Sequence, residues 1–242
     1  MSKYKVALDA GHGGSDPGAV YNGRQEKDDT LDLTLAVGDI LKKNGIDVFY
    51  TRTNDEYETP FKKATDANDA KADANNSGAD LFVSIHRNSS EKPNQYSGVE
   101  TLVYNDSGLK SEVARNINNQ LENVGFKNLG VDTRKNLVVL KRTKMPAVLV
   151  EAGFINNEKD NYIFDQEFDK VANAIADGIL ESLLVHATLI LTIQTAATTK
   201  LTAPIIPAVP IIPIVPTIPT APTIPIIPAT PAISTVPAMP AI

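Results

Sequence analysis

The chain has 242 residues, of which 42% are hydrophobic and 21% are charged, and its formal net charge is -6. This composition is typical of a soluble globular protein, and it offers no basic surface to the phosphate backbone of a nucleic acid, so we expect no nucleic-acid partner. The absence of cysteine excludes disulfides and thiolate metal ligands, so any metal must be bound by His, Asp or Glu.

Short apolar runs in the first three quarters of the chain predict buried β-strands. In chain order they cover residues 5–10, 47–52, 80–86, 99–104, 136–140 and 147–152. Between them, apolar residues at helical spacing predict helices over 26–44, from about 107 to 125, and from 168 onward. Continuous apolar strands alternating with amphipathic helices indicate an α/β sheet that is covered on both faces.

The composition changes near residue 184, and Lys200 is the only charged residue beyond that point. Proline stands at every third position from Pro204 to Pro231. This period blocks helices and strand ladders, and it matches the three residues per turn of polyproline II. We therefore predict a folded domain over 1–184 and a low-complexity, Pro-rich tail over 185–242, which is either an extended spacer or disordered.

Two segments bear on where the protein is found. The apolar part of residues 183–199 is shorter than the ~20 residues that a membrane span needs, so we read it as a continuation of the last helix and expect no transmembrane segment. The first residues carry no apolar region of signal-peptide length, so we expect synthesis in the cytoplasm without a signal peptide.

Polar residues follow three of the predicted strands, at the sheet edge where α/β proteins bind ligands. His12 lies in the glycine-rich stretch after the first strand, His86 ends the run "DLFVSI", and Glu151 follows "PAVLV". Glu26 opens the first predicted helix. Two histidines and one carboxylate suit Zn²⁺ with a fourth position left for water, and Glu151 is then placed to exchange protons with that water and a leaving nitrogen.

Each of these residues also has a simpler explanation. Glu26 favours the dipole of the helix that it opens, and His86 on its own reads as a hydrogen-bonded core histidine. The glycines around His12 are common in phosphate loops, but "GHGGSDPG" has neither the P-loop ending nor the dinucleotide-binding spacing. Four coincidences at one sheet edge are less expected than one site. His186 lies beyond the last apolar face, and we assign it a structural role.

Five motifs are similar to those of a known family. They are "VALDAGHGGSDPGA", "GRQEKD", "ADLFVSIHRN", "GVETLVY" and "LVVLKRTKMPAVLVEAGFINNEKD". Over residues 4–182 the chain resembles the zinc-dependent N-acetylmuramoyl-L-alanine amidases of the amidase 3 type, which occur in bacterial autolysins and phage endolysins. The resemblance implies a single twisted, mostly parallel six-stranded sheet flanked by helices.

The resemblance also implies a function and a site. One Zn²⁺ per chain is held by His12, Glu26 and His86, and Glu151 is the catalytic acid/base. The substrate is peptidoglycan, in which the enzyme hydrolyses the amide between N-acetylmuramic acid and L-alanine. Because no signal peptide is expected, we expect the protein to reach the cell wall after release by a holin-type or mother-cell lysis. Two alternatives remain, a non-catalytic wall-binding protein on the same fold and another zinc amidohydrolase, such as a peptidase or deacetylase. Substrate-binding residues and the oligomeric state are not implied.

The chain departs from the family pattern at two positions, and it carries no recognisable wall-binding module. Arg87 stands where the family usually has a small residue, and we expect it to alter the groove beside the metal. Ala70 occupies the place of an arginine that often precedes the second histidine motif. The Pro-rich tail stands where many relatives carry a wall-binding module.

Overall fold

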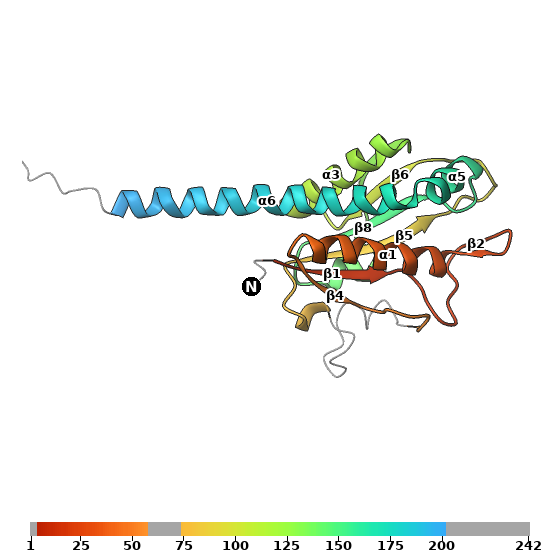
Figure 1. The fold of residues 1–242 in the computed structure, drawn as a ribbon, viewed down its shortest axis with the longest axis horizontal. Coiled ribbons are helices and arrows are strands. Elements are labelled where there is room, and N and C mark those ends of the chain that lie inside the picture. Colours follow the sequence, from red (N-terminus) through yellow and green to blue (C-terminus); the bar gives the residue numbers. More distant parts are fainter. Residues whose placement is uncertain (1–3, 58–73, 202–242) are drawn as a thin grey trace, which may run out of the picture. The chain divides into compact units, whose positions relative to one another are not determined.

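A six-stranded mixed sheet forms the centre of the computed structural model, which describes residues 4–57 and 74–201 (Figure 1). The strands lie in the order β4-β1-β5-β8-β6-β7. Their bounds are Lys5–Ala10 for β1, Asp47–Tyr50 for β4, Leu81–Asn88 for β5, Val99–Val103 for β6, Asn128–Thr133 for β7 and Ala147–Phe154 for β8. Neighbours pair in parallel except β6 and β8, which are antiparallel. The predicted α/β fold with a mostly parallel six-stranded sheet is confirmed.

Apolar side chains from both faces of the sheet are covered, as the strand sequences predict. Helices α1 (Glu26–Lys43), α3 (Leu109–Val124) and α6 (Phe168–Leu201) pack their apolar residues against one face. The other face is covered by the short helix α4 (Val138–Arg142) and the residues around the 3₁₀ turn Ala74–Asn76.

The first helix forms where the apolar spacing predicts it. Leu33, Val37 and Leu41 of α1 are fully buried against the sheet, and acidic residues occupy the first turn, where they interact favourably with the helix dipole. The helix is followed by Gly45, whose φ of 77° lies in the left-handed region that glycine adopts without strain. The start of α1 is therefore held in place by its own packing, and Glu26 with it.

The sequence predicts a strand over 136–140, and this prediction is wrong. Val138–Arg142 form helix α4, in which Val139 and Leu140 are buried against the sheet. The sixth strand is instead β7, none of whose residues is fully buried. An edge strand with one partner lacks the continuous apolar run of a central strand. The apolar pattern therefore missed β7 and assigned a strand to the short buried helix α4 instead.

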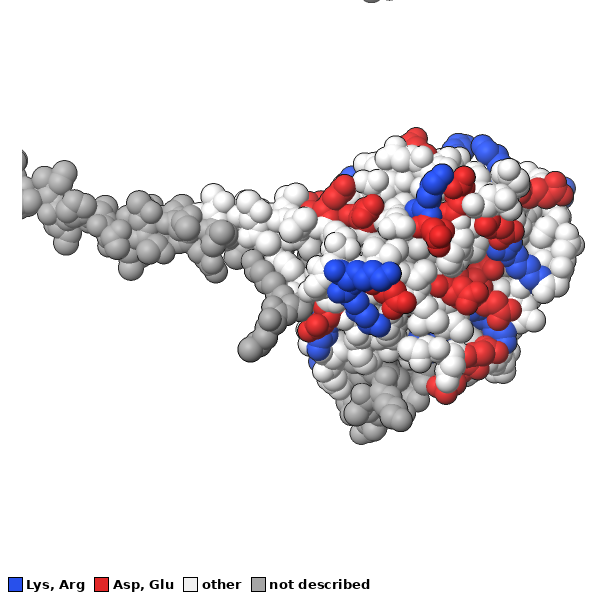
Figure 2. Space-filling view, viewed as in Figure 1, with Lys and Arg blue, Asp and Glu red and all other residues white. Residues whose placement is uncertain are grey.

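Helix α6 continues past residue 184 to Leu201, which confirms that residues 183–199 prolong the last helix. Leu184, Val185 and Leu189 on this part are exposed, and no charged residue lies between Glu181 and Lys200. Where Figure 2 does not draw it in grey, this part of the helix is white. Within the described residues, no helix combines the length and the apolar character that crossing a membrane requires. The Pro-rich tail from residue 204 and Ala70 lie outside the described residues.

Candidate functional site

The loop between β1 and α1 presents two of the four predicted site residues. It begins at the carboxyl end of β1, where the Gly11 amide donates to the carbonyl of Ile85 on β5 at 2.9 Å. It includes a two-stranded ribbon, β2 (Val20–Tyr21) with β3 (Arg24–Gln25), which runs directly into Glu26. His12 therefore follows one strand of the sheet, and Glu26 is delivered to the same edge by the first turn of α1.

The structure brings the three predicted metal ligands together. His12 Nε2 lies 3.1 Å from Glu26 Oε2, and His86 Nδ1 lies 3.0 Å from Glu26 Oε1. One ligand atom from each residue falls within a group whose members are all within 4.8 Å of one another. In a tetrahedral site with bonds of about 2.1 Å, ligand atoms are about 3.4 Å apart, so this spacing is compatible with one shared metal ion.

Further contacts orient the ligands, and sequence reasoning missed them. Asp16 Oδ2 lies 3.0 Å from His12 Nδ1, which leaves Nε2 of that ring facing Glu26. The amides of Ala19 and Arg87 donate to the two oxygens of Glu26 at 2.9 and 3.0 Å. A carboxylate that holds the second ring nitrogen of a metal-binding histidine fixes its orientation. Asp16 stands four residues after His12, and this short spacing is the sequence feature from which the contact could have been predicted.

The ionisation of His12 and Glu26 favours a positive charge within the cluster. Burial opposes the charged form of His12, but the hydrogen bonds and charges of Glu26 and Asp16 outweigh it and raise the pKa of His12 to about 9. Burial likewise opposes ionisation of Glu26, but hydrogen bonds from His12 and His86 hold the pKa of Glu26 well below its usual range. Without a metal ion, a protonated His12 therefore lies beside an ionised Glu26, and a bound cation would replace this proton.

Two of the loop glycines leave the space that the ligands fill. A Cβ at Gly11 would overlap the ring of His86, and a Cβ at Gly18 would lie 2.6 Å from both Glu26 Oε2 and His12 Cδ2. Gly13 and Gly14 serve a different contact, because a Cβ there would meet the backbone of residues 56 and 57. The glycine-rich stretch is thus explained partly by clearance around the ligands and partly by close packing of a neighbouring segment.

A buried arginine joins the two segments that carry His12 and Glu26. Arg52, which is 3% exposed, donates to the carbonyls of Ala10, Gly11 and Lys27 at 3.1, 3.0 and 2.8 Å. Thr30 Oγ1 adds a hydrogen bond to Gly11 O at 2.7 Å. Because each of these carbonyls lies within two residues of a ligand, Arg52 acts as a positioning residue for the cluster.

Glu151 lies beside the cluster on the neighbouring strand. It is the register partner of His86 on β5, so both side chains project from the same face of the sheet. Its Oε2 atom is buried and has no hydrogen-bond partner within the described part of the chain. Burial raises the pKa of Glu151 to about 7; the charge of His86 opposes this shift, and the charges of Glu26 and Glu100 add to it. A carboxyl group with this pKa is suited to accept and return a proton near neutral pH.

Glu100, which sequence reasoning did not single out, extends the same row of side chains. It is the register partner of Glu151 on β6, and its Oε1 accepts a hydrogen bond from Asn88 Nδ2 at 2.6 Å. Glu100 is therefore partnered where Glu151 is not. The sequence feature that could have pointed to Glu100 is its place as a charged residue near the start of the apolar strand β6.

The expectation that Arg87 alters the groove beside the metal is wrong. Its buried side chain donates to Asp29 of α1 at 2.6 Å and to Asn161 of α5 (Glu158–Gln166) at 2.7 Å. Its guanidinium also lies 4.0 Å from the centroid of the Phe164 ring. Since alternate residues of a strand face opposite sides, Arg87 points away from the face that carries His86 and ties α1 to α5.

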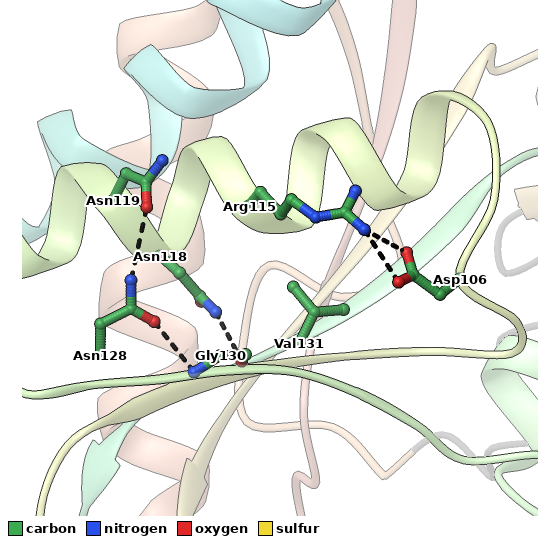
Figure 3. A pocket seen from close by; sticks show the side chains of 7 residues that line it. All are labelled: Asp106, Arg115, Asn118, Asn119, Asn128, Gly130 and Val131. Atoms are coloured by element: carbon green, nitrogen blue, oxygen red, sulfur yellow. Dashed lines mark hydrogen bonds and ion pairs between the residues drawn. The ribbon is translucent and has the colours of Figure 1, made fainter. Parts of the chain in front are cut away.

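A separate pocket between α3 and β7 lacks comparable chemistry (Figure 3). Its charged and amide side chains are paired with neighbours in the pocket: Arg115 Nη2 bonds both oxygens of Asp106 at 2.7 and 2.8 Å, and Asn118 Nδ2 donates to Gly130 O at 2.6 Å. Within the described residues, the group of His, Asp and Glu arranged to hold a metal ion is the one at His12.

The fold and the site together define an α/β protein with a candidate mononuclear metal centre at the carboxyl ends of its parallel strands. Residues 6–181 match the family described as N-acetylmuramoyl-L-alanine amidase. The chain belongs to this family, as its sequence motifs predict.

Relatives of the chain include bacterial and phage proteins. The sporulation-specific N-acetylmuramoyl-L-alanine amidase of Bacillus subtilis is 39% identical over 160 residues, which are 64% of this chain and 58% of that protein. The endolysin of Bacillus phage SPP1 is 37% identical over 190 residues, covering 76% of this chain and 67% of the endolysin. The crystal structure of an N-acetylmuramoyl-L-alanine amidase from Clostridium difficile 630 superposes with a TM-score of 0.68 at 32% identity, covering 76% of this chain and 98% of that one.

Proposed function

We propose that the protein is a zinc-dependent amidase that hydrolyses the bond between N-acetylmuramic acid and L-alanine in peptidoglycan. The observation that carries the proposal is the His12–Glu26–His86 cluster with the unpaired oxygen of Glu151 beside it. Family membership supports the substrate, because relatives with this fold bear the name N-acetylmuramoyl-L-alanine amidase.

The donor set fits zinc. Two imidazole nitrogens and one carboxylate oxygen are the ligands of many catalytic zinc sites, which keep a fourth position open. Calcium and magnesium prefer sets made only of oxygen. His12, Glu26 and His86 would hold the zinc ion, which would supply Lewis-acid polarisation to the scissile carbonyl and to the attacking water.

Glu151 moves the proton in the proposed reaction. Its carboxylate accepts a proton from the attacking water, whose oxygen forms the new bond to the carbonyl carbon. Glu151 then returns that proton to the nitrogen of L-alanine as the carbon–nitrogen bond breaks, so the products are a carboxylic acid on the sugar and a free peptide amine. Asp16 keeps His12 oriented, and the amides of Ala19 and Arg87 keep Glu26 oriented.

A Glu151→Gln substitution tests this assignment. The rate at which purified cell walls release new L-alanine amino termini should fall by about 10²–10⁴-fold, the usual contribution of a general acid/base. Zinc content should stay unchanged, and the protein should be no less stable, because an unpaired buried carboxylate is removed. Glu100→Gln, the same change one strand away, is the matched control and should lose far less activity.

Product analysis and metal removal complete the test. Mass spectrometry of the digest should show intact glycan and free stem peptide, and a chelator should abolish release until zinc is restored. Cleavage within the peptide, or loss of acetyl groups alone, would instead identify a peptidase or a deacetylase. Wild-type release by Glu151→Gln would refute the mechanism, and wall binding without any soluble product would refute catalysis.

A further inference from the structure

A second pocket opens at the same edge of the sheet as the metal ligands. It has a volume of about 350 Å³ and is lined by Tyr96, Lys127, Leu129 and Phe154, with the amide side chains of Asn94 and Gln95. Tyr96 is 57% exposed and Leu129 40% exposed, while Phe154 lies beneath at 5%, its ring 6.1 Å from that of Tyr96. Tyr96 and Leu129 therefore give the pocket an exposed apolar wall beside its amide and lysine side chains, a combination that is common in ligand pockets.

The wall of the pocket is preformed. The loop that carries Tyr96 is attached to the segment after β8, where Asn157 Nδ2 donates to Tyr96 O at 3.0 Å. The buried carboxylate of Asp160 accepts hydrogen bonds from Ser97 Oγ at 2.7 Å and from the Gly98 amide at 2.8 Å. A pocket whose loop is already ordered loses less entropy when it binds a ligand.

The pocket lies on the Glu151 side of the cluster. Along the sheet, β1 precedes His12, β5 carries His86, β8 carries Glu151, and β6 and β7 follow in that order. Phe154 is the register partner of Asn88, two residues beyond His86. With strands about 4.8 Å apart and residues about 3.3 Å apart along them, the backbone of Phe154 at the pocket lies within about 10 Å of that of His86.

This order indicates which part of the substrate reaches the pocket. In the proposed function, on which this step rests, the scissile carbonyl faces the metal ligands and Glu151 protonates the leaving nitrogen. The peptide that begins at this nitrogen therefore extends from Glu151 toward β6 and β7. A peptide spans about 3.3–3.6 Å per residue, so its second and third residues arrive at the pocket.

The charge of the pocket agrees with this direction. Lys127 is exposed and takes part in no ion pair with the rest of the described chain. The N-acetylated glycan is uncharged once its lactyl group is in amide linkage, whereas the stem peptide carries carboxylates. We propose that the pocket of Tyr96 and Lys127 is a subsite for the stem peptide, and that Lys127 pairs with a carboxylate of its second or third residue.

Two soluble substrates test the subsite on the full-length zinc-loaded protein. They are N-acetylmuramoyl-L-alanyl-D-glutamyl-L-lysine and the same compound with its carboxyl groups amidated. The wild type should show a kcat/KM for the free acid about three to ten times that for the amide, which is the scale of one partly exposed charge-assisted hydrogen bond. Lys127→Gln should remove this preference and leave hydrolysis of the amide unchanged. Lys92→Gln removes a lysine from the same loop region outside the pocket and should keep the preference.

A binding measurement separates this inference from the proposed function. Calorimetric titration with the free tripeptide L-alanyl-D-glutamyl-L-lysine should show binding to the wild type and about three- to tenfold weaker binding to Lys127→Gln. Turnover with no carboxylate preference, or an equal loss on both substrates in Lys127→Gln, would overturn the subsite and leave the proposed function standing. Tripeptide binding through Lys127 without hydrolysis of either substrate would overturn the proposed function and leave the subsite standing.

Discussion

Replacing Gly18 by alanine tests the clearance that the glycine loop provides to the metal ligands. A Cβ at this position would lie 2.6 Å from Glu26 Oε2 and 2.6 Å from His12 Cδ2. Non-bonded heavy atoms settle near 3.5 Å, so the ligands must move by about 0.9 Å. Metal–ligand distances tolerate only about 0.2 Å. We therefore expect Gly18→Ala to lose most of its zinc affinity.

Backbone strain must be separated from this clash, and Gly23 is the matched control. Both glycines have left-handed backbones, with φ of 64° at Gly18 and 82° at Gly23, but a Cβ at Gly23 meets nothing within 4 Å. A left-handed conformation costs a residue with a Cβ about 1–2 kcal/mol, which lowers the melting temperature of a domain of this size by a few degrees. Both variants should lose this stability, and only Gly18→Ala should lose the metal.

The assay is competition with a chelator of known zinc affinity, combined with thermal melts with and without zinc. Zinc should raise the melting temperature of the wild type and of Gly23→Ala, because a ligand that binds only the folded state stabilises it. The melting temperature of Gly18→Ala should not respond. If Gly18→Ala bound zinc as tightly as Gly23→Ala, the reasoning that the loop provides clearance for the ligands would be refuted.

Three further outcomes follow from the site and its supports. In metal-free protein, the rise in the pKa of His12 from 6.5 to about 9 adds stability that is complete below pH 6.5 and is lost as the pH rises through 9, so melts of the chelated protein should show a falling melting temperature across that range. Arg87→Ala removes a fully buried hydrogen-bond partner of Asp29 and Asn161, while Asp29 keeps its ion pair with Arg24. It should therefore lower the unfolding free energy by about 1–3 kcal/mol in urea titrations, whereas exposed Arg115→Ala should cost less than about 1 kcal/mol. Arg52→Lys keeps the charge but loses the planar set of donors, so chelator competition should show weaker zinc binding, and the loss of buried hydrogen bonds should also lower the melting temperature.

The fold could be predicted from the sequence where apolar patterns are strong. Leu33, Val37 and Leu41 recur at helical spacing and are buried in α1. The pattern failed at the sheet edge, where β7 has few buried residues and the apolar run at 138–140 serves a helix. Apolar patterns indicate which residues are buried, but a short run of buried residues is compatible with either a strand or a helix.

The candidate site could be predicted from residue types at strand ends, because polar side chains in such places are costly unless they are used. The supporting residues could not. Asp16 and Arg52 act through contacts with a ring nitrogen and with backbone carbonyls, and such contacts depend on loop geometry. The position of Arg87 on the helix-covered face of β5 likewise depends on Asp29 and Phe164, which are distant in the sequence.

The sequence by itself restricted the ligand chemistry of this protein: with no cysteine and three histidines, any metal has to be bound by His, Asp or Glu, and His12, Glu26 and His86 were the predicted set. Only the tertiary structure decided how these groups meet, because their separations of 3.0–3.1 Å arise from strand register and from the loop held by Arg52. Within the described residues, it also left Glu151 Oε2 without a hydrogen-bond partner and paired Glu100 with Asn88. Glu151 and Glu100 thus differ in their pairing, because pairing depends on three-dimensional neighbours.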